Sequence, residues 1–184
     1  GQAIGAPVLP TLRPKSTTIY TPWVRNAKIG NEIFEEGRMN PKDQATWDRI
    51  KDSKEAKLLG LLDMLMGNGD RHSGNWVVGE DGKLVGLDNG MGWAFMGGPT
   101  NPGPGRGAKP WDLFGALADQ GRFLQRHIGK SDIDFSLADI EEIRKRMEAL
   151  RPQFKHLNRE EWLDFSLEML KEVRRRARGS GFMY

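Results

Sequence analysis

The chain has 184 residues, of which 38% are hydrophobic and 29% are charged, which indicates one globular domain and not a disordered polypeptide. It contains no cysteine, which excludes disulfide bonds, thiolate nucleophiles and cysteine-based zinc sites. The net charge of +3 is too small to indicate a charged partner by itself. No run of about 18 apolar residues is present, and the first residues lack the basic and apolar parts of a signal peptide.

The first half of the chain predicts one well-defined helix. Residues 1–16 are rich in Pro and Gly and predict irregular chain, and residues 17–20 predict a short strand. Residues 23–34 have no clear pattern, and residues 35–52 predict a polar loop with a helical turn near 42–50. Ser53 is a typical N-cap, and the apolar residues that follow it predict a buried helix that ends at Gly67-Asn68-Gly69.

The next segment predicts a β-hairpin. Trp76-Val77-Val78 is typical of a strand, Asp81-Gly82 of a two-residue turn, and Leu84-Val85-Gly86-Leu87 of a returning strand. Asp88-Asn89-Gly90 ends this second strand. Residues 97–110 contain too many Gly and Pro residues for regular structure. We expect helices in the remainder, over residues 111–128, 137–150 and 159–178.

The hairpin brings polar side chains together. In an antiparallel pair the start of the first strand lies beside the end of the second, so Asn75 and Asp88 are expected at the same end. Asp70 lies just upstream of the first strand. Oxygen ligands of this kind, completed by phosphate oxygens and water, suit magnesium. Phosphoryl transfer needs such a metal and a carboxylate that orients the attacking hydroxyl, and these three residues supply both.

Two motifs in this region resemble those of a known family. Asp70-Arg71-His72-x-x-Asn75 resembles the catalytic loop of phosphatidylinositol 3-/4-kinases and related kinase-like proteins, and Asp88-Asn89-Gly90 resembles their metal-binding Asp-Phe-Gly element. The run Gly67-Asn68-Gly69-Asp70-Arg71, followed by Asn75-Trp76, is most similar to type II phosphatidylinositol 4-kinases and their bacterial and phage relatives. HipA-like toxin kinases and secretory-pathway kinases have similar loops. The resemblance is strong over residues 58–95 and weak elsewhere.

The resemblance implies an α+β, mainly α fold: a protein-kinase-like C-terminal lobe whose small β-hairpin carries the metal site. It implies that Asp70 is the catalytic base, and that Arg71 and His72 support the loop or touch phosphate. Asn75 and Asp88 would bind Mg²⁺, or alternatively Mn²⁺, together with ATP. The acceptor would be a hydroxyl group of a protein or a lipid, and the location cytoplasmic or phage-associated.

The same alignment divides the chain. Residues 1–24 resemble the end of the small lobe and the hinge, with Tyr20 and Trp23 beside the adenine, and residues 25–184 resemble the large lobe. The Gly-rich loop and phosphate-binding lysine of a small lobe would lie upstream of residue 1. We therefore expect the small lobe to be absent or truncated, so that the chain is a fragment or a degenerate kinase, completed where necessary by a missing lobe or another chain.

The Gly- and Pro-rich segment follows Asp-Asn-Gly, where kinases have an activation or substrate loop. Arg106 and Lys109 are its candidate substrate contacts, although a plain surface loop is the simpler interpretation. The segment has no GxxxxGK[ST] motif, and no HExxH pair exists in the chain, which argues against a P-loop enzyme and a zinc hydrolase. The basic run over residues 171–178 is expected to be a solvated helix face, with contact to anionic lipid or nucleic acid as the alternative.

Other interpretations remain open at this point. Asp, Asn and Gly are common in turns for local reasons, so Asp70, Asn75 and Asp88 could be turn residues, but chance must then explain both motifs and their spacing. The truncated front end favours an inactive kinase-like module that serves in docking or assembly. The arginine cluster near the C-terminus is the only support for a nucleic-acid-binding helical domain.

Overall fold

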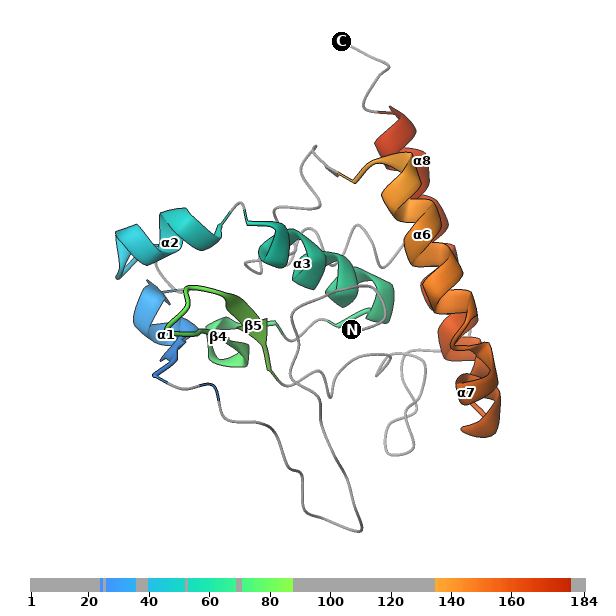
Figure 1. Ribbon diagram of the computed structural model, residues 1–184, viewed down its shortest axis with the longest axis horizontal. Helices are drawn as coiled ribbons and strands as arrows, with labels where there is room; N and C mark the ends of the chain where they lie inside the picture. The colour runs from blue at the N-terminus through green and yellow to red at the C-terminus, as the bar shows by residue number, and fades with distance from the viewer. Residues whose placement is uncertain are drawn as a thin grey trace.

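The computed structural model describes residues 24, 26–35, 40–51, 53–68, 71–87 and 135–179. Short strands and helices gather at one end, two long helices lie at the other, and helix α3 runs between them (Figure 1). The described part is mainly helical with a small antiparallel sheet, which confirms the expected α+β class. The predicted strand over 17–20, the Gly- and Pro-rich loop over 97–110 and the predicted helix over 111–128 lie outside the described residues.

The segment without a clear sequence pattern forms three very short elements. These are β1 (Lys28–Ile29), α1 (Gly30–Ile33) and β2 (Phe34–Glu35). Strand β2 pairs antiparallel with β3 (Asn40–Pro41) in a separate two-stranded sheet. Strand β1 joins the hairpin strands β4 and β5 described below, in the order β1-β4-β5.

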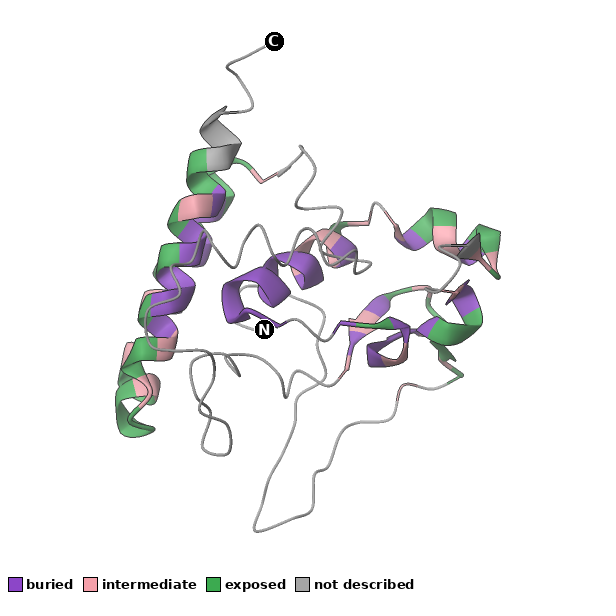
Figure 2. Cartoon of the chain, turned by 180° about the vertical axis from the view of Figure 1, so that it is seen from behind, coloured by how far each residue is buried: buried purple, intermediate pink, exposed green. Residues whose placement is uncertain are grey.

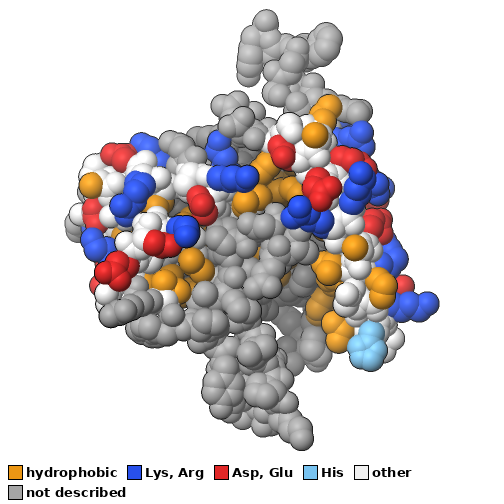
Figure 3. Space-filling model, viewed as in Figure 1, with side chains coloured by type: hydrophobic (Ala, Val, Ile, Leu, Met, Phe, Trp, Pro, Cys, Tyr) orange, Lys and Arg blue, Asp and Glu red, His pale blue; other side chains and the backbone are white. Residues whose placement is uncertain are grey.

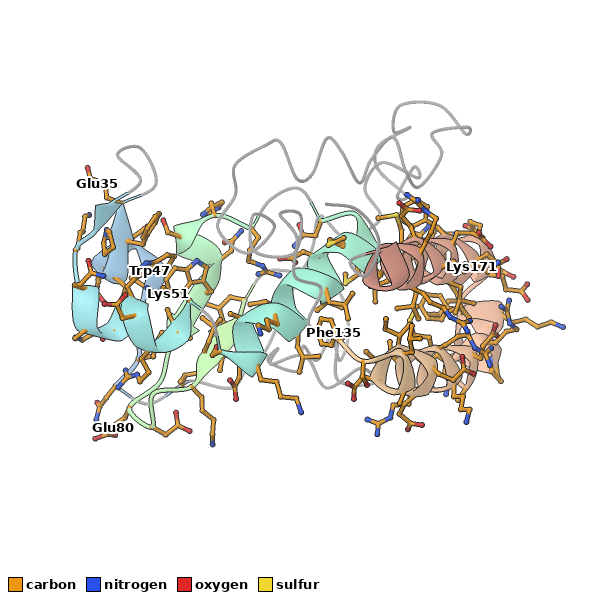
Figure 4. The ribbon with its side chains drawn as sticks, turned by 90° about the horizontal axis from the view of Figure 1, so that it is seen from above. Glu35, Trp47, Lys51, Glu80, Phe135 and Lys171 are labelled. Atoms are coloured by element: carbon orange, nitrogen blue, oxygen red, sulfur yellow. The ribbon has the colours of Figure 1, made fainter. Side chains whose placement is uncertain are left out.

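Helix α2 (Gln44–Ile50) forms where a helical turn was expected. Asp43 is its N-cap, because one carboxylate oxygen accepts from the amide nitrogen of Thr46 at 3.0 Å. The other carboxylate oxygen accepts from the Lys28 ammonium at 2.8 Å. The Trp47 ring stacks on Phe34 at a centroid distance of 4.3 Å, which joins α2 to β2 (Figure 4).

Helix α3 (Lys54–Met66) is the buried helix that the sequence predicts. The Ser53 hydroxyl caps it by accepting from Ala56 N at 3.1 Å. Gly67 ends it with φ 61°, a left-handed conformation that favours glycine. Every residue from Leu59 to Met66 is buried (Figure 2), so the helix contacts protein on all sides.

The hairpin consists of β4 (Trp76–Val78) and β5 (Leu84–Gly86), paired antiparallel as expected. Its turn is longer than the two residues predicted. Gly82 N donates to Gly79 O at 2.9 Å, and Gly79 N donates to Lys83 O at 2.9 Å. Gly82 has φ 79°, so a left-handed glycine follows the turn and adds a residue to the connection.

The C-terminal region forms α6 (Leu137–Glu148), α7 (Arg151–His156) and α8 (Glu160–Gly179). Ser136 and Asp139 form a capping box at the start of α6. The helix expected over 137–150 ends two residues early, and a short second helix begins with Pro152 in its first turn. The helix expected over 159–178 is confirmed with nearly the same limits.

Helix α8 packs on both α3 and α6 and forms the centre of the core. Leu163, Met169 and Val173 of α8 are almost completely buried, and the Ser166 hydroxyl donates to Leu65 O of α3 at 2.6 Å. Phe135 precedes α6 and packs between α3 and α6 (Figure 4). On the far side of α3, a Cβ built on Gly86 would lie 2.5 Å from Leu59 Cδ1, so this glycine permits the close contact of α3 with β5.

Within the described ranges, no helix is both long enough and apolar enough to cross a bilayer. Acidic and basic side chains are interspersed over the outer face of the α6–α8 pair (Figure 3). Several of them form ion pairs one helical turn apart, such as Arg144 with Glu141 at 2.7 Å. Exposed pairs of this kind contribute little stability, so burial of the apolar face holds this helical pair in place.

Candidate active site

The predicted catalytic loop connects α3 to β4. Its last residues form one turn of 3-10 helix, η3 (Ser73–Asn75). Asn75 N donates to His72 O at 2.9 Å, and the Nδ1 atom of the His72 ring accepts from Gly74 N at 3.0 Å. Two hydrogen bonds therefore fix the turn that delivers Asn75 to the start of the hairpin, and His72 takes part with both its main chain and its side chain.

The hairpin places Asn75 beside the end of the returning strand. Trp76 pairs with Gly86, and one residue further out Leu87 N donates to Asn75 O at 2.8 Å. Asn75 and Leu87 are thus direct neighbours at the open end of the two hairpin strands. Asp88, the next residue, lies outside the described residues, but its chain neighbour Leu87 is fixed at the end of the hairpin that carries Asn75.

Arg71 lies completely buried beneath this end of the hairpin. Its Nε and Nη2 atoms donate to the Asp63 carboxylate, at 3.0 Å to Oδ2 and 2.9 Å to Oδ1 respectively. Its Nη1 atom donates to Asn75 O at 2.7 Å and also to Leu87 O. One guanidinium group therefore connects α3, the catalytic loop and both strands of the hairpin at its open end.

Asp63 is the partner that the buried arginine requires. It lies on α3, has no exposed surface, and also accepts from Asn68 Nδ2 at 2.9 Å. Burial raises the pKa of the Asp63 carboxyl, while the charge and hydrogen bonds of Arg71 and the amide of Asn68 act in the opposite direction. The contacts supply the donors that a buried carboxylate needs.

The segment before α2 supports the loop from the other side. The Ser73 hydroxyl donates to the Asn31 side-chain oxygen, which ties α1 to η3. Gly30 lies against the main-chain oxygen of Ser73 and the ring of Trp76, with no room for a side chain. The described part of the loop, residues 71–75, is therefore held by contacts with α1, α3 and the hairpin.

The structure describes three of the predicted site residues. Arg71 is buried in the network above, His72 is exposed, and Asn75 is largely buried at the start of β4. The others lie outside the described residues: Asp70, Asp88, Tyr20, Trp23, Arg106 and Lys109.

The oxygen donors near the loop are the side chains that could hold a metal ion. No group of three His, Cys, Asp or Glu side chains in the described ranges could hold one. Asn75, paired with Leu87, would supply an amide oxygen to such an ion, and Asp88 would supply a carboxylate but lies outside the described residues. Hard oxygen donors of this type fit Mg²⁺ better than zinc or copper, so the residues present are compatible with magnesium.

The sequence interpretation did not single out Asp63. A lone carboxylate among the apolar residues of a buried helix is a usable signal, since charged residues are almost never fully buried unless they are paired. Its partner could not be chosen from the sequence, because several basic residues precede and follow the helix. Asn31 and Gly30 were missed because the segment around them has no periodic pattern.

With this geometry in place, one comparison identifies a relationship. Residues 23–103 match the family described as phosphatidylinositol 3- and 4-kinase. This match supports a relation to the phosphatidylinositol 3-/4-kinase superfamily. It covers less than half of the chain but includes α1, α2, α3, the catalytic loop and the hairpin. Comparisons with curated proteins and with solved structures give no significant match.

The basic run near the C-terminus lies on α8, away from this loop (Figure 1). Lys171 forms an ion pair with Glu168, and Arg175 with Glu172 at 2.7 Å. Acidic residues of the same helix therefore offset part of its positive charge.

Proposed function

We propose that the chain is a Mg²⁺- and ATP-dependent phosphotransferase of the phosphatidylinositol 3-/4-kinase-like superfamily that acts on a protein or lipid hydroxyl. Within that superfamily the motifs favour the type II phosphatidylinositol 4-kinase-like group with its bacterial and phage members. In this proposal residues 25–184 form the large lobe, and residues 1–24 the end of the small lobe and the hinge.

The observation that carries the proposal is the hydrogen bond from Leu87 N to Asn75 O at 2.8 Å. It makes the last residue of the catalytic-loop motif a neighbour of the residue before Asp88. This pairing supports an arrangement in which the two motifs lie together and serve one phosphoryl-transfer site. The family match over residues 23–103 supports the same conclusion independently of the geometry.

Each motif residue has a proposed role. Asp70 accepts the proton of the attacking hydroxyl, and Asn75 and Asp88 hold the metal through their side-chain oxygens. When bound, the metal neutralises charge on the transferred phosphoryl group. The exposed His72 lies in the same loop, while the adenine would contact Tyr20 and Trp23. Arg106 and Lys109 remain the proposed contacts for an anionic substrate.

Transfer of the γ-phosphate from radiolabelled ATP tests the proposal. The full chain is incubated with Mg²⁺ or Mn²⁺ and offered phosphatidylinositol vesicles, a general protein acceptor and its own hydroxyl groups. Asp70→Asn and Asp88→Asn should each abolish transfer. Asp81→Asn is the matched control, because Asp81 is an exposed carboxylate at the turn end of the same hairpin.

The outcomes separate the possibilities. Transfer to lipid or protein that requires both carboxylates supports the proposal and identifies the acceptor class. Full activity in both variants contradicts the assigned roles. Metal-dependent ATP binding without any transfer favours the inactive docking module, and a chain that neither binds nor transfers in the presence of Mg²⁺ or Mn²⁺ contradicts a kinase function.

A further inference from the structure

We infer that Asp63 and Arg71 are positioning residues that fix the main chain of Asn75, a proposed metal ligand, against Leu87 at the open end of the hairpin, and that Arg71 does not contact phosphate. The inference rests on the proposed function, because it concerns the same metal site. It assigns a role to Asp63, a residue outside both sequence motifs.

The directions of the hydrogen bonds support this role. The Nε and Nη2 atoms of the Arg71 guanidinium face the Asp63 carboxylate, at 3.0 and 2.9 Å. The Nη1 atom faces the opposite way and donates to the main-chain oxygens of Asn75 and Leu87. Because the guanidinium is planar and rigid, fixing one edge on α3 also fixes the two carbonyl groups on the other side.

The two carbonyl groups belong to residues at or next to the proposed metal ligands. Asn75 carries one proposed ligand, and Leu87 is joined by a peptide bond to the residue that carries the other. A shift of the Asn75 carbonyl would move the main chain that carries this proposed ligand. Magnesium requires near-ideal octahedral geometry, so its site is sensitive to such a shift.

Burial argues against the alternative that Arg71 binds phosphate. Both Arg71 and Asp63 have 0% side-chain exposure, and Arg71 directs its donors to Asp63 and to main-chain oxygens. A buried ion pair is also poor evidence for a stabilising role, since an apolar pair of similar volume is often equally stable. Fixing the geometry of the hairpin end explains a charged pair at this place better than stability does.

The test uses four forms of the full chain: the wild type, Arg71→Lys, the double variant Asp63→Leu/Arg71→Met, and Ser166→Ala. Lys keeps the positive charge, but its compact ammonium group lacks the planar fork that lets Arg71 bind the carboxylate and both carbonyl oxygens at once. The double variant removes both charges together, which avoids an unpaired buried charge. Ser166→Ala is the matched control, because it also removes a buried hydrogen bond to a main-chain oxygen, Leu65 O of α3, on the side that faces α8.

The measurement is the dissociation constant of Mn²⁺ in the presence of ATP, followed by electron paramagnetic resonance. The folded fraction is measured by near-ultraviolet circular dichroism in the same buffer, and the constant is corrected for it. A variant that is only destabilised then returns the wild-type constant. We expect Arg71→Lys and the double variant to bind Mn²⁺ about tenfold to a hundredfold more weakly, and Ser166→Ala to bind like the wild type.

Wild-type binding constants in Arg71→Lys and in the double variant, after correction, overturn the inference and leave the proposed function standing. No Mn²⁺ binding by the wild type overturns both the inference and the metal site on which it rests. Weakening in Ser166→Ala equal to that in the double variant also overturns the inference, because any loss of packing on α3 would then have the same effect.

Discussion

A Cβ atom built on Gly30 would lie 2.4 Å from Cε2 of Trp76, closer than the non-bonded contacts that Cβ atoms make in proteins. The same atom would lie 2.3 Å from the main-chain oxygen of Ser73. The missing side chain therefore lets α1 lie directly against the catalytic loop and the first hairpin strand. This contact joins the N-terminal part of the family match to the loop that carries its motif.

The first prediction concerns this contact. Gly30→Ala should destabilise the protein by about 1–3 kcal/mol, because the obstructing atoms belong to main chain and to a fully buried ring. Urea unfolding measures the effect. Gly79→Ala is the control: its nearest neighbour is the Asp81 carboxylate oxygen at 2.9 Å, on an exposed side chain that can move. Equal losses in the two variants would contradict the proposed close packing.

The second prediction concerns the stability of the buried ion pair, separately from metal binding. Asp63→Leu and Arg71→Met should each lower the free energy of unfolding by about 3–5 kcal/mol, because each leaves an unpaired buried charge. The double variant should recover most of that loss. A double-mutant cycle of urea unfolding measures the coupling, and purely additive losses would show that the two residues do not act as a pair.

The sequence predicted the elements that have strong periodic or turn signals. The apolar run after Ser53, the Gly67 C-cap and the Asp81-Gly82 turn signal between two apolar runs were enough to place α3 and the hairpin. Antiparallel pairing alone predicts that Asn75 and Asp88 lie at one end of the hairpin. The residue directly opposite Asn75 depends on the length of the turn, and the longer turn observed pairs Asn75 with Leu87.

Other features depend on contacts that no local pattern encodes. Strands β1 and β2 have two residues each, too few for a period to be visible. Strand β1 forms because Lys28 and Ile29 pair with β4, and β2 forms because it pairs with β3. The pairing of Asp63 with Arg71 requires the chain to reverse after Gly67, which brings together residues that lie eight positions apart. Helix α7 was missed because the expected helices left out residues 151–158, which are too few to show a helical period, although Pro152 is tolerated in the first turn of a helix.

The third prediction concerns pH. The Lys28 ammonium, and then the amide and hydroxyl of Thr46, hold the pKa of the Asp43 carboxyl well below its usual range. The unfolded chain has an Asp pKa of about 3.9, so it takes up a proton more readily than the folded chain as the pH falls. The stability from Asp43 is therefore complete above that value and is lost progressively as the pH falls below it.

Asp43→Asn keeps an acceptor for Thr46 but removes the charge. The difference in unfolding free energy between wild type and variant should thus be largest near neutral pH and shrink below about pH 4. Urea unfolding at a series of pH values measures it. Lys28→Met should remove much of the same pH dependence, and a difference that grows as the pH falls would contradict the assignment.

The fourth prediction tests the packing of α8. Leu163 is 1% exposed in the core between α3 and α6, whereas Leu157, just before the same helix, is 63% exposed. Leu163→Ala should destabilise the protein by about 2–5 kcal/mol, and Leu157→Ala by less than about 0.5 kcal/mol. Thermal and urea unfolding compare the same chemical change at both sites. Similar losses of stability in the two variants would show that the face of α8 that carries Leu163 is not buried.

The last prediction separates two roles of His72. Its Nδ1 atom accepts from Gly74 N at 3.0 Å, a contact that shapes the turn before Asn75. The side-chain oxygen of Asn can accept the same hydrogen bond, whereas Ala cannot. Amide hydrogen exchange at Gly74 should therefore be faster in His72→Ala than in His72→Asn or the wild type, and equal rates in all three would exclude a role in shaping the turn.

Phosphoryl transfer by the same variants tests the second role. If the imidazole also contacts the reacting groups, phosphoryl transfer falls in His72→Asn even though the turn is intact. If the role of His72 is confined to the turn, His72→Asn keeps its activity and only His72→Ala loses it.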